Sequence, residues 1–305
     1  MLYEILNKKL VHQRVNDLKR SLTASKVFQP SNVSNFVFLC GANKSISEIS
    51  ERRKALIKFS TKNLPHTQFF LAEKMFSTLQ KEGHKGNILD VEHLISEFSD
   101  YILIILESYS AFAELRAFSH NKLRDKLIVI NDLKFKNVES FINLGPIKAI
   151  EEAKGKERII HYNMSKDGVY RLDAIGDVYA NLFDLLKHPS KPKSSSVDIN
   201  SCDPSKKLDK SSAMFIHDLV YFTGPIKYKE LIEILKLIFG NSNFNDVKHL
   251  LAILCSFESI ERNKHGLYRS RLNKTYYEYR FDTNKIISTF RNYILKLYSD
   301  RIYGY

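Results

Sequence analysis

The chain of 305 residues contains few cysteines, and the three that it has lie far apart. Cys40, Cys202 and Cys255 predict neither a disulfide framework nor a metal-ligand pair, so we expect reduced thiols in a cytoplasmic protein. The ten histidines are also scattered, and none pairs with another at the spacing of a metal site. We therefore predict no metal centre and no bound cofactor.

Long apolar runs are absent too. The longest, residues 101–106, has the length of a strand and is too short to span a membrane. The N-terminal segment alternates apolar and charged residues and lacks the uninterrupted apolar core of a signal peptide. The chain has no P-loop, no GxGxxG motif and no Ser-His-Asp order typical of hydrolases. We expect no membrane association.

Positive charge is abundant. Lysine and arginine number 47 against 34 acidic residues, which gives a formal net charge of +13. This excess favours an anionic partner, either nucleic acid or an acidic membrane face, and says nothing about fold. Hydrophobic residues make up 44% of the chain, enough to bury a sizeable core.

Short apolar runs alternate with helical patterns between residues 36 and 187. This alternation with short connections predicts an α/β fold of the Rossmann or flavodoxin type, in which helices cover both faces of a parallel sheet. Ligands of such sheets bind beyond the carboxyl ends of the strands, here after Leu39, Leu106 and Ile130. The predicted strands are 36–41, 66–71, 101–106, 127–131 and 158–162, and the predicted helices are 46–62, 72–82, 91–98, 111–123, 139–153 and 170–187.

Three further segments flank this domain. Residues 1–35 predict an amphipathic helix (2–22) and a lead-in, and the serine-rich segment 188–212, which holds three of the seven prolines, predicts a flexible linker. Residues 213–305 predict a winged helix-turn-helix domain, because three helices precede a basic hairpin. Its predicted elements are helices 214–222, 228–239 and 245–257, a hairpin over 259–281 with a final strand in TYYEYRF, and helix 283–299.

The predicted hairpin is rich in cations with tyrosines between them. Lysine and arginine contact phosphates, and tyrosines can stack on bases, so we predict a nucleic-acid interface without sequence-specific reading. The alternative is a solvated hairpin whose tyrosines pack on the sheet. The predicted contacts are Lys248 on the preceding helix and Arg262, Lys264, Arg269, Arg271, Lys274 and Arg280, with Tyr268, Tyr276, Tyr277 and Tyr279 between them.

A carboxylate follows the most strongly apolar run. After Leu106 the segment 107–110 predicts a polar loop, and a helix near Ala111 presents Glu114 in its expected first turn. The helix N-terminus would attract an anionic ligand and keep this carboxylate ionised. A fixed carboxylate stabilises an oxocarbenium-like centre during cleavage of a C1′–N bond. A glutamate that merely suits the helix dipole is the alternative.

The first strand is followed by Cys40 and Gly41, where the turn either brings backbone to a ligand or simply ends the strand. The order FVFLCG, DVEHLISEFSDYILIILES, FAELRAF, KLIVINDLKFK and SFINLGP resembles the nucleoside deoxyribosyltransferase-like effectors of bacterial retrons. The resemblance covers most of residues 36–150 by motif and 213–305 only by architecture. It implies a nucleoside deoxyribosyltransferase-like fold with a winged-helix region behind it.

This resemblance also implies the roles of individual residues. Glu114 matches the catalytic glutamate of the family pattern E-S-P-G-S-x-x-E-L, and Glu92 matches the upstream helix glutamate. We predict both as catalytic residues, with Glu92 positioning the sugar. The chain departs from that pattern at Tyr109-Ser110-Ala111 and at Arg116, which puts the phosphate contacts in doubt. The substrate-binding residues that it implies are Arg53, Glu73, Glu107, Ser108 and Asn143. To these we add Cys40 and Gly41, from the turn after the first strand, and Ser110, whose hydroxyl could partly replace the missing glycine loop.

The function implied by the resemblance is that of a toxic effector in anti-phage defence. It would cleave the N-glycosidic bond of NAD or a related nucleotide, as substrate, with water as acceptor. It would associate with a retron reverse transcriptase and its branched RNA–DNA product (msDNA), as a homo-oligomer or a larger complex. The altered loop favours a second hypothesis, a nucleotide-sensing DNA-binding regulator without turnover. A structural subunit of a ribonucleoprotein is a third.

Overall fold

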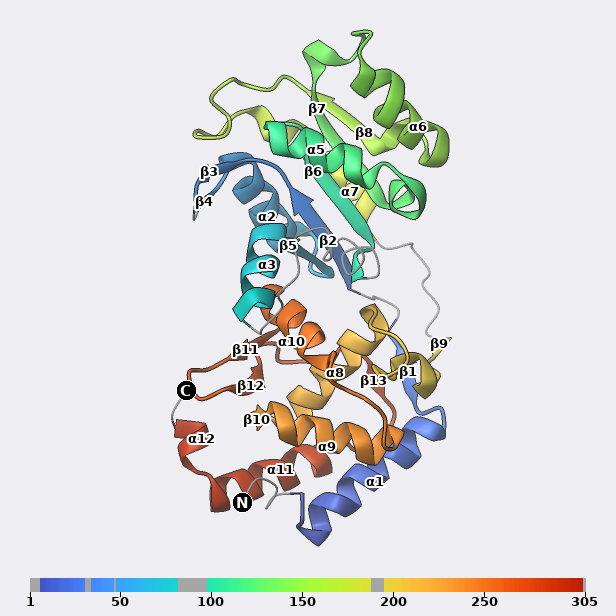
Figure 1. Ribbon diagram of the computed structural model, residues 1–305, viewed down its shortest axis with the longest axis vertical. Helices are drawn as coiled ribbons and strands as arrows, with labels where there is room; N and C mark the ends of the chain where they lie inside the picture. The colour runs from blue at the N-terminus through green and yellow to red at the C-terminus, as the bar shows by residue number, and fades with distance from the viewer. Residues whose placement is uncertain (1–5, 31–33, 47, 82–97, 188–194, 304–305) are drawn as a thin grey trace. The chain divides into compact units, whose positions relative to one another are not determined.

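The computed structural model describes residues 6–30, 34–46, 48–81, 98–187 and 195–303, which form two compact units (Figure 1). One comprises Ser34–Lys74 and Leu89–Ser190 and is called the α/β unit here. The other combines Met1–Val33, Met75–Ile88 and Lys191–Tyr305 and is called the terminal unit. The first residues therefore belong to the same compact unit as the C-terminal residues. No described helix has the length and apolar character needed to cross a membrane.

The α/β unit is built on a five-stranded sheet in which every pair of neighbours is parallel, as predicted. The strands lie in the order β5-β2-β6-β7-β8. If the five are numbered as they follow one another along the chain, this order is 2-1-3-4-5, which is flavodoxin-like. Apolar residues follow one another along these strands, without alternating with polar residues, because both faces of the sheet are covered. In sheet order the strands are β5 (Thr67–Leu71), β2 (Asn35–Cys40), β6 (Tyr101–Ile105), β7 (Leu127–Asp132) and β8 (Ile159–Tyr162).

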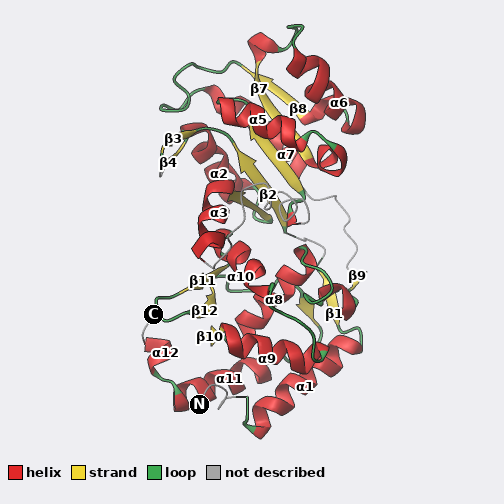
Figure 2. Ribbon diagram, viewed as in Figure 1, coloured by secondary structure: helices red, strands yellow, loops and turns green. Residues whose placement is uncertain are grey.

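Helices cover both faces of this sheet (Figure 2). On one face α2 (Glu51–Asn63) and α7 (Tyr179–Leu186) bury Leu56, Leu182 and Leu186 against the strands. On the other lie α5 (Tyr109–Phe118) and α6 (Lys148–Lys154), because the right-handed connections from β6 to β7 and from β7 to β8 run across the sheet in the direction opposite to that from β2 to β5.

Several predicted boundaries differ from the structure. The short antiparallel pair β3 (Asn43–Ser45) and β4 (Glu48–Ile49) delays the start of α2 to Glu51, where Ser50 caps the helix. A π-turn (Asn143–Ile147) that contains Pro146 precedes α6, because proline has no N–H to donate to a regular helix. Other changes are α5 ending at Phe118 before the 3₁₀ turn Asn121–Lys126, short 3₁₀ turns at Leu133–Phe135 and Lys156–Arg158, and the 3₁₀ turn Ala174–Val178 preceding α7.

In the terminal unit, helices pack around two small sheets. The first sheet has the order β10-β12-β11, and β11 and β12 form the predicted hairpin. The elements are α1 (Lys9–Thr23), α8 (Lys210–Thr223), α9 (Tyr228–Phe239), α10 (Val247–Ser256), α11 (Asn284–Leu297), α12 (Asp300–Tyr303), β10 (Ile226–Lys227), β11 (Ile260–Arg262) and β12 (Leu267–Ser270). The helix α3 (Ala72–Lys81) starts in the α/β unit and continues into the terminal unit.

The second small sheet corrects one prediction. The strand expected to complete the hairpin, β13 (Glu278–Tyr279), pairs instead with β1 (Val27–Gln29), where Val27 faces Tyr279. The third member, β9 (Ser195–Ser196), lies within the predicted linker. That segment also contains the 3₁₀ turn Ile199–Cys202 and the capping residue of α8. Asp198 and Asp209 of this segment therefore cap the 3₁₀ turn and α8, which is a common role for aspartate.

Candidate functional site

The candidate site lies where the strand order reverses, between the carboxyl ends of β2 and β6. The chain leaves β2 toward β5 and leaves β6 toward β7, in opposite directions along the sheet, so the loops after these two neighbouring strands separate and form a crevice. Cys40 is the last residue of β2, Gly41 begins the loop after it, and Glu107 comes from the loop after β6. This is the edge at which the sequence predicted chemistry.

Glu107 is the buried polar centre of this crevice. One carboxylate oxygen, Oε1, accepts hydrogen bonds from the Ala42 backbone N–H (2.9 Å) and the Ser50 hydroxyl (2.6 Å). The other, Oε2, accepts from Arg52 Nη1 at 3.0 Å. A Cβ at Gly41 would lie 2.7 Å from Glu107 Oε1, so glycine is needed for this close approach. Because both of its oxygens are engaged, Glu107 organises the loops and is not the reactive group.

Arg52 links this carboxylate to the loop after β8. Its Nη2 donates to Asp173 Oδ2 (2.7 Å) and to the Ser165 carbonyl (2.6 Å), and its Nε donates to Asp173 as well (3.0 Å). All three charged side chains are buried. A guanidinium suits this position because its planar fork serves two carboxylates at once. The loops after β2, β6 and β8 are thereby held together.

A second group of charges lies beside Glu107. The buried Arg53 forms a two-pronged ion pair with Glu73, with N–O distances of 2.8 and 3.0 Å, and also donates to the Leu39 carbonyl (2.9 Å). Burial opposes ionisation of Glu73, but the Arg53 guanidinium outweighs it, so the pKa of Glu73 falls below its ordinary value. Glu73 is therefore a fixed negative charge at this edge of the sheet.

Glu114 completes this second group. Its side chain is half-buried, it is hydrogen-bonded to the Cys40 thiol, and its buried Oε2 has no hydrogen-bond partner among the described residues. Burial, and then the negative charge of Glu73, raise the pKa of Glu114 to about 7. Burial, and then Glu114, raise the pKa of Cys40 well above its ordinary value, so this thiol is not a nucleophile.

The position of Glu114 corrects one expectation. Since α5 begins at Tyr109, Glu114 lies in the second turn, beyond the free N–H groups, and the first turn has no acidic residue. The prediction that the helix dipole keeps Glu114 ionised was therefore wrong. Its carboxyl group exchanges a proton near neutral pH instead, which suits acid–base chemistry.

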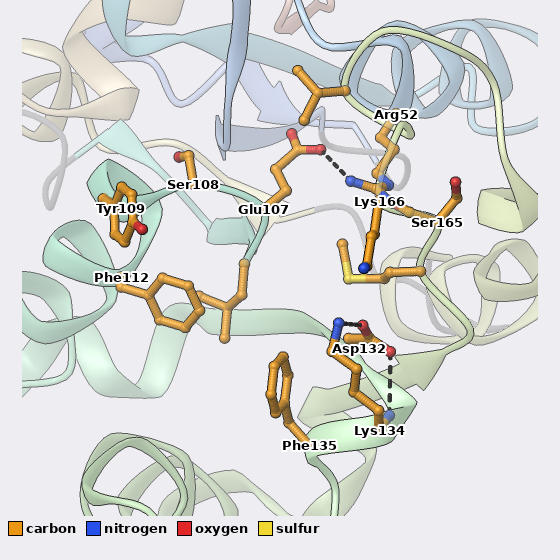
Figure 3. Close-up of a pocket in the computed structure, with 13 residues that line it drawn as sticks. Arg52, Glu107, Ser108, Tyr109, Phe112, Asp132, Lys134, Phe135, Ser165 and Lys166 are labelled. Carbon is orange, nitrogen blue, oxygen red and sulfur yellow. Dashed lines mark hydrogen bonds and ion pairs between the residues drawn. The ribbon is translucent and has the colours of Figure 1, made fainter.

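Glu107 also lines an open pocket of about 400 Å³. Figure 3 shows the aromatic side chains of Tyr109, Phe112 and Phe135 on one side and charged side chains on the other. The charged and polar lining residues are Arg52, Glu107, Ser108, Asp132, Lys134, Ser165 and Lys166. Aromatic rings beside lysines suit a ligand with a flat ring and an anionic group. Glu114 is not among the residues that line this pocket.

The structure therefore divides the predicted site residues. It brings Cys40, Gly41, Arg53, Glu73 and Glu114 into one group beside Glu107, whereas Ser108 lines the pocket. The hydroxyl of Ser108 caps α5 and pairs with that of Ser110 at 2.9 Å.

Two other predicted residues are not in either group. Both amide hydrogens of Asn143 are donated to the Phe135 (2.6 Å) and Val138 (2.7 Å) carbonyls, so Asn143 shapes this loop and its N–H groups are not open to a substrate. The predicted role of Glu92 lies outside the described residues.

Sequence reasoning missed Arg52, Ser50 and Asp173. A usable signal was present in α2, where Arg52 shares the spacing of Leu56 and Ser60 and thus a place on the buried face. An arginine on the buried face of a helix requires acidic partners, and it points to the charged network described above. Nothing in the local sequence of Asp173 indicated that it was one of them.

The predicted nucleic-acid contacts lie on the terminal unit. All six cations of the hairpin region are exposed, and Lys248 is half-buried. Several form surface ion pairs, as Arg271 does with Glu258 (3.5 Å) and Arg280 with Glu278 (3.1 Å). Tyr268, Tyr276 and Tyr277 are buried, so the expectation that they stack on bases is wrong and the packing alternative holds for them.

Among the described residues, no three His, Cys, Asp or Glu side chains gather as metal ligands would. An α/β unit with a polar crevice at its strand switch, joined to a unit with an exposed basic hairpin, defines a two-unit α/β protein. Comparison with known proteins gives the family. Residues 48–262 match the family described as "STM3845 retron effector protein", and the chain belongs to that family.

Two proteins of Escherichia coli are similar over most of their length. "Retron Ec73 putative ribosyltransferase/DNA-binding protein" is 41% identical over 290 residues, which cover 92% of this chain and 91% of the relative. "Retron Ec86 putative ribosyltransferase/DNA-binding protein" is 28% identical over 236 residues, which cover 75% and 73%. The chain is thus a retron effector, as the sequence motifs indicated.

Proposed function

We propose that the α/β unit cleaves the N-glycosidic bond of NAD or a related nucleotide and that Glu114 is its catalytic carboxylate. The observation that carries this proposal is a half-buried carboxyl group with an unpartnered oxygen and a pKa of about 7, at the strand switch of the sheet. The ribosyltransferase names of both relatives support the same kind of bond chemistry.

In the proposed reaction, the C1′–N bond breaks and its electron pair leaves on the base nitrogen. The ionised Glu114 stabilises the positive charge that develops at C1′. A water oxygen then bonds to C1′, and its proton passes to the carboxylate, which releases it to solvent. The fixed charge of Glu73 favours this proton uptake, and the Arg53 guanidinium holds Glu73 in place. The 400 Å³ pocket supplies aromatic and cationic contacts for the remainder of the nucleotide.

The experiment is release of free base from NAD and from nucleotides, followed by chromatography, with the purified protein alone and with its retron partners. Glu114→Gln should abolish release because an amide neither carries charge nor accepts the proton. Glu152→Gln, an exposed glutamate on α6, is the matched control and should retain full activity. The proposal fails if neither preparation releases base, or if Glu114→Gln releases it as fast as the control.

The rest of the proposal concerns the terminal unit. Three helices followed by the β11–β12 hairpin support a winged helix-turn-helix assignment, and both relatives are named as DNA-binding. We propose that the exposed cations of the hairpin contact the RNA–DNA product of a retron reverse transcriptase. In this complex the toxic activity would be held in check as part of anti-phage defence, in a homo-oligomer or larger assembly in the cytoplasm.

A nucleotide-sensing regulator without turnover is the second candidate. The observation that favours it is that Glu107, which lines the pocket, has both carboxylate oxygens engaged, while Glu114 does not line the pocket. Calorimetric binding of a nucleotide without any release of base, together with sequence-specific DNA binding, would identify this function and exclude the first.

A further inference from the structure

We propose that the α/β unit has a second ligand site, a groove along α2 that binds single-stranded nucleic acid. The groove has a volume of about 600 Å³ and shares no lining residue with the pocket at the strand switch. It is lined by Glu51, Lys54, Ala55, Lys58, Phe59, Lys62, Asn63, Leu172 and Tyr179, which come from α2, from α7 and from the segment before the 3₁₀ turn at Ala174.

Lysines form one wall of the groove. Lys54, Lys58 and Lys62 follow one another at intervals of four residues, so they lie on one face of α2 about 6 Å apart along the axis. Lys54 is neutralised by Glu48 and Glu51. Lys58 and Lys62 are exposed, and no acidic side chain in the described part of the chain pairs with either.

This arrangement of lysines has a cost in the free protein. Like charges four residues apart repel each other and destabilise a helix. Lys62 in the last turn offsets part of this cost by its interaction with the helix dipole, but Lys58 is mid-helix and does not. An anionic ligand in the groove would remove the repulsion, so the pair is suited to phosphate groups.

Aromatic rings line the groove beside these lysines. Phe59 stacks on Tyr179 with ring centroids 4.2 Å apart and planes 11° from parallel. The Tyr179 hydroxyl donates to the Ala55 carbonyl (3.4 Å), which fixes the ring, and Leu172 is 68% exposed beside them. Flat apolar surface next to a row of cations is the combination that binds single strands, because bases stack while phosphates meet lysines.

An acidic peptide is the other ligand that such lysines attract. Its aspartate and glutamate side chains have no flat apolar surface to place on Phe59, Tyr179 and Leu172, so the lining of the groove favours nucleic acid. Duplex DNA hides its bases in the stack and presents mainly phosphates, so a single strand fits best. The groove is thus a contact surface separate from the hairpin of the terminal unit.

The test uses the full chain and a fluorescent thymidine oligonucleotide of about ten nucleotides. Binding is measured by anisotropy as a function of salt, in a background where Lys264→Ala and Lys274→Ala weaken the hairpin contacts. Lys58→Glu with Lys62→Glu should weaken binding about tenfold and reduce the salt slope by about 1.4, for two phosphate contacts at about 0.7 each. The control Lys148→Glu with Lys156→Glu makes the same change in net charge at exposed positions outside the groove.

Photocrosslinking with 4-thiothymidine locates the strand. Cross-links to peptides that contain Phe59 or Tyr179, lost in the Lys58/Lys62 variant and kept in the control, would support the groove. The inference is overturned if cross-links map only elsewhere, if both charge reversals weaken binding equally, or if polyglutamate displaces the oligonucleotide at equal charge concentration. Thermal unfolding checks that the reversed variant is folded, and Lys58→Gln with Lys62→Gln replaces it if not. Release of base is not a readout here, so this result is independent of the catalytic proposal.

Discussion

Arg52 and Glu107 form a buried ion pair, with Arg52 Nη1 3.0 Å from Glu107 Oε2, that joins the first turn of α2 to the loop after β6. Both side chains are buried, with exposed fractions of 3% for Arg52 and 0% for Glu107. Asp173 supplies the second carboxylate, so the guanidinium is surrounded by two negative charges. The geometry of the whole crevice depends on this one cation.

Replacing Arg52 should therefore destabilise the α/β unit strongly. Arg52→Ala leaves Glu107 and Asp173 buried without their cation, and we expect a loss of about 3–5 kcal/mol in the free energy of unfolding. Arg52→Lys should recover only part of it, because an ammonium group lacks the planar fork. Urea unfolding followed by circular dichroism measures both, and Arg171→Ala, at an exposed arginine, should change stability little. Equal losses for the two alanine variants would contradict the role assigned to Arg52.

The proposed role of Glu114 sets the pH dependence of activity. The carboxylate acts in its ionised form, and its pKa is raised to about 7. Activity should therefore rise about tenfold between pH 6 and pH 8, where the ionised fraction grows from roughly a tenth to nine tenths. The measurement is the initial rate of base release at subsaturating substrate across this range. A rate that is flat from pH 5 upwards would show that the essential carboxylate has an ordinary pKa.

The same shift predicts how stability depends on pH. A carboxyl group whose pKa is about 7 when folded and 4.5 when unfolded binds more protons in the folded state between these values. Stability is lost as the pH rises through this window, by at most about 3 kcal/mol. Glu114→Gln, which cannot ionise, should raise the melting temperature at pH 8 and leave it nearly unchanged at pH 4. A variant less stable than wild type at pH 8 would contradict the raised pKa.

Gly41 tests how closely the loop after β2 must approach Glu107. A Cβ at this position would lie 2.7 Å from Glu107 Oε1 and 3.1 Å from Arg53 Cδ, and both neighbours are held by hydrogen bonds. Gly41→Ala should cost about 1–3 kcal/mol and reduce activity, because both charged groups must move. Gly176→Ala is the control, since its nearest neighbour is 3.7 Å away on Tyr179. Unfolding and base release of the two variants should differ clearly.

The sequence predicted the sheet well because the information is local. Each strand is a short run of β-branched and apolar residues, as in residues 101–106, and parallel pairing follows from the alternation with helices. Glu114 could be identified as a candidate catalytic residue from the sequence because it matches a family motif. The side of α5 to which it points depends on where that helix begins, and its pKa depends on Glu73, which is distant in sequence.

Long-range polar pairing was beyond the sequence. Arg52 and Asp173 are 121 positions apart, and no local sequence pattern around either residue predicts that the two form an ion pair. The pairing of β13 with β1 is similar, because Val27 and Tyr279 come from opposite ends of the chain. Two-residue strands carry too little pattern to indicate a partner, so the hairpin was the natural but incorrect place for the last one.

The terminal unit has its own buried carboxylate, and the last prediction concerns it. Asp218 on α8 accepts hydrogen bonds from the backbone N–H groups of Tyr276 (2.7 Å) and Tyr277 (3.0 Å) and from the Tyr279 hydroxyl (2.9 Å). It thereby fixes the segment that joins the basic hairpin to β13. Asp218→Asn keeps the shape of the side chain but replaces one carboxylate oxygen by an NH₂ group, which would face a hydrogen-bond donor. We expect a loss of about 2–3 kcal/mol in the free energy of unfolding.

This loss should be confined to the terminal unit. Limited proteolysis should cut the Asp218→Asn variant faster between residues 270 and 280, because these are the residues that Asp218 holds. Glu233→Gln, which removes a surface pair with Lys236, should leave both stability and cleavage rate nearly unchanged. Faster cleavage within residues 101–173, without change at 270–280, would show that Asp218 does not act where its hydrogen bonds lie.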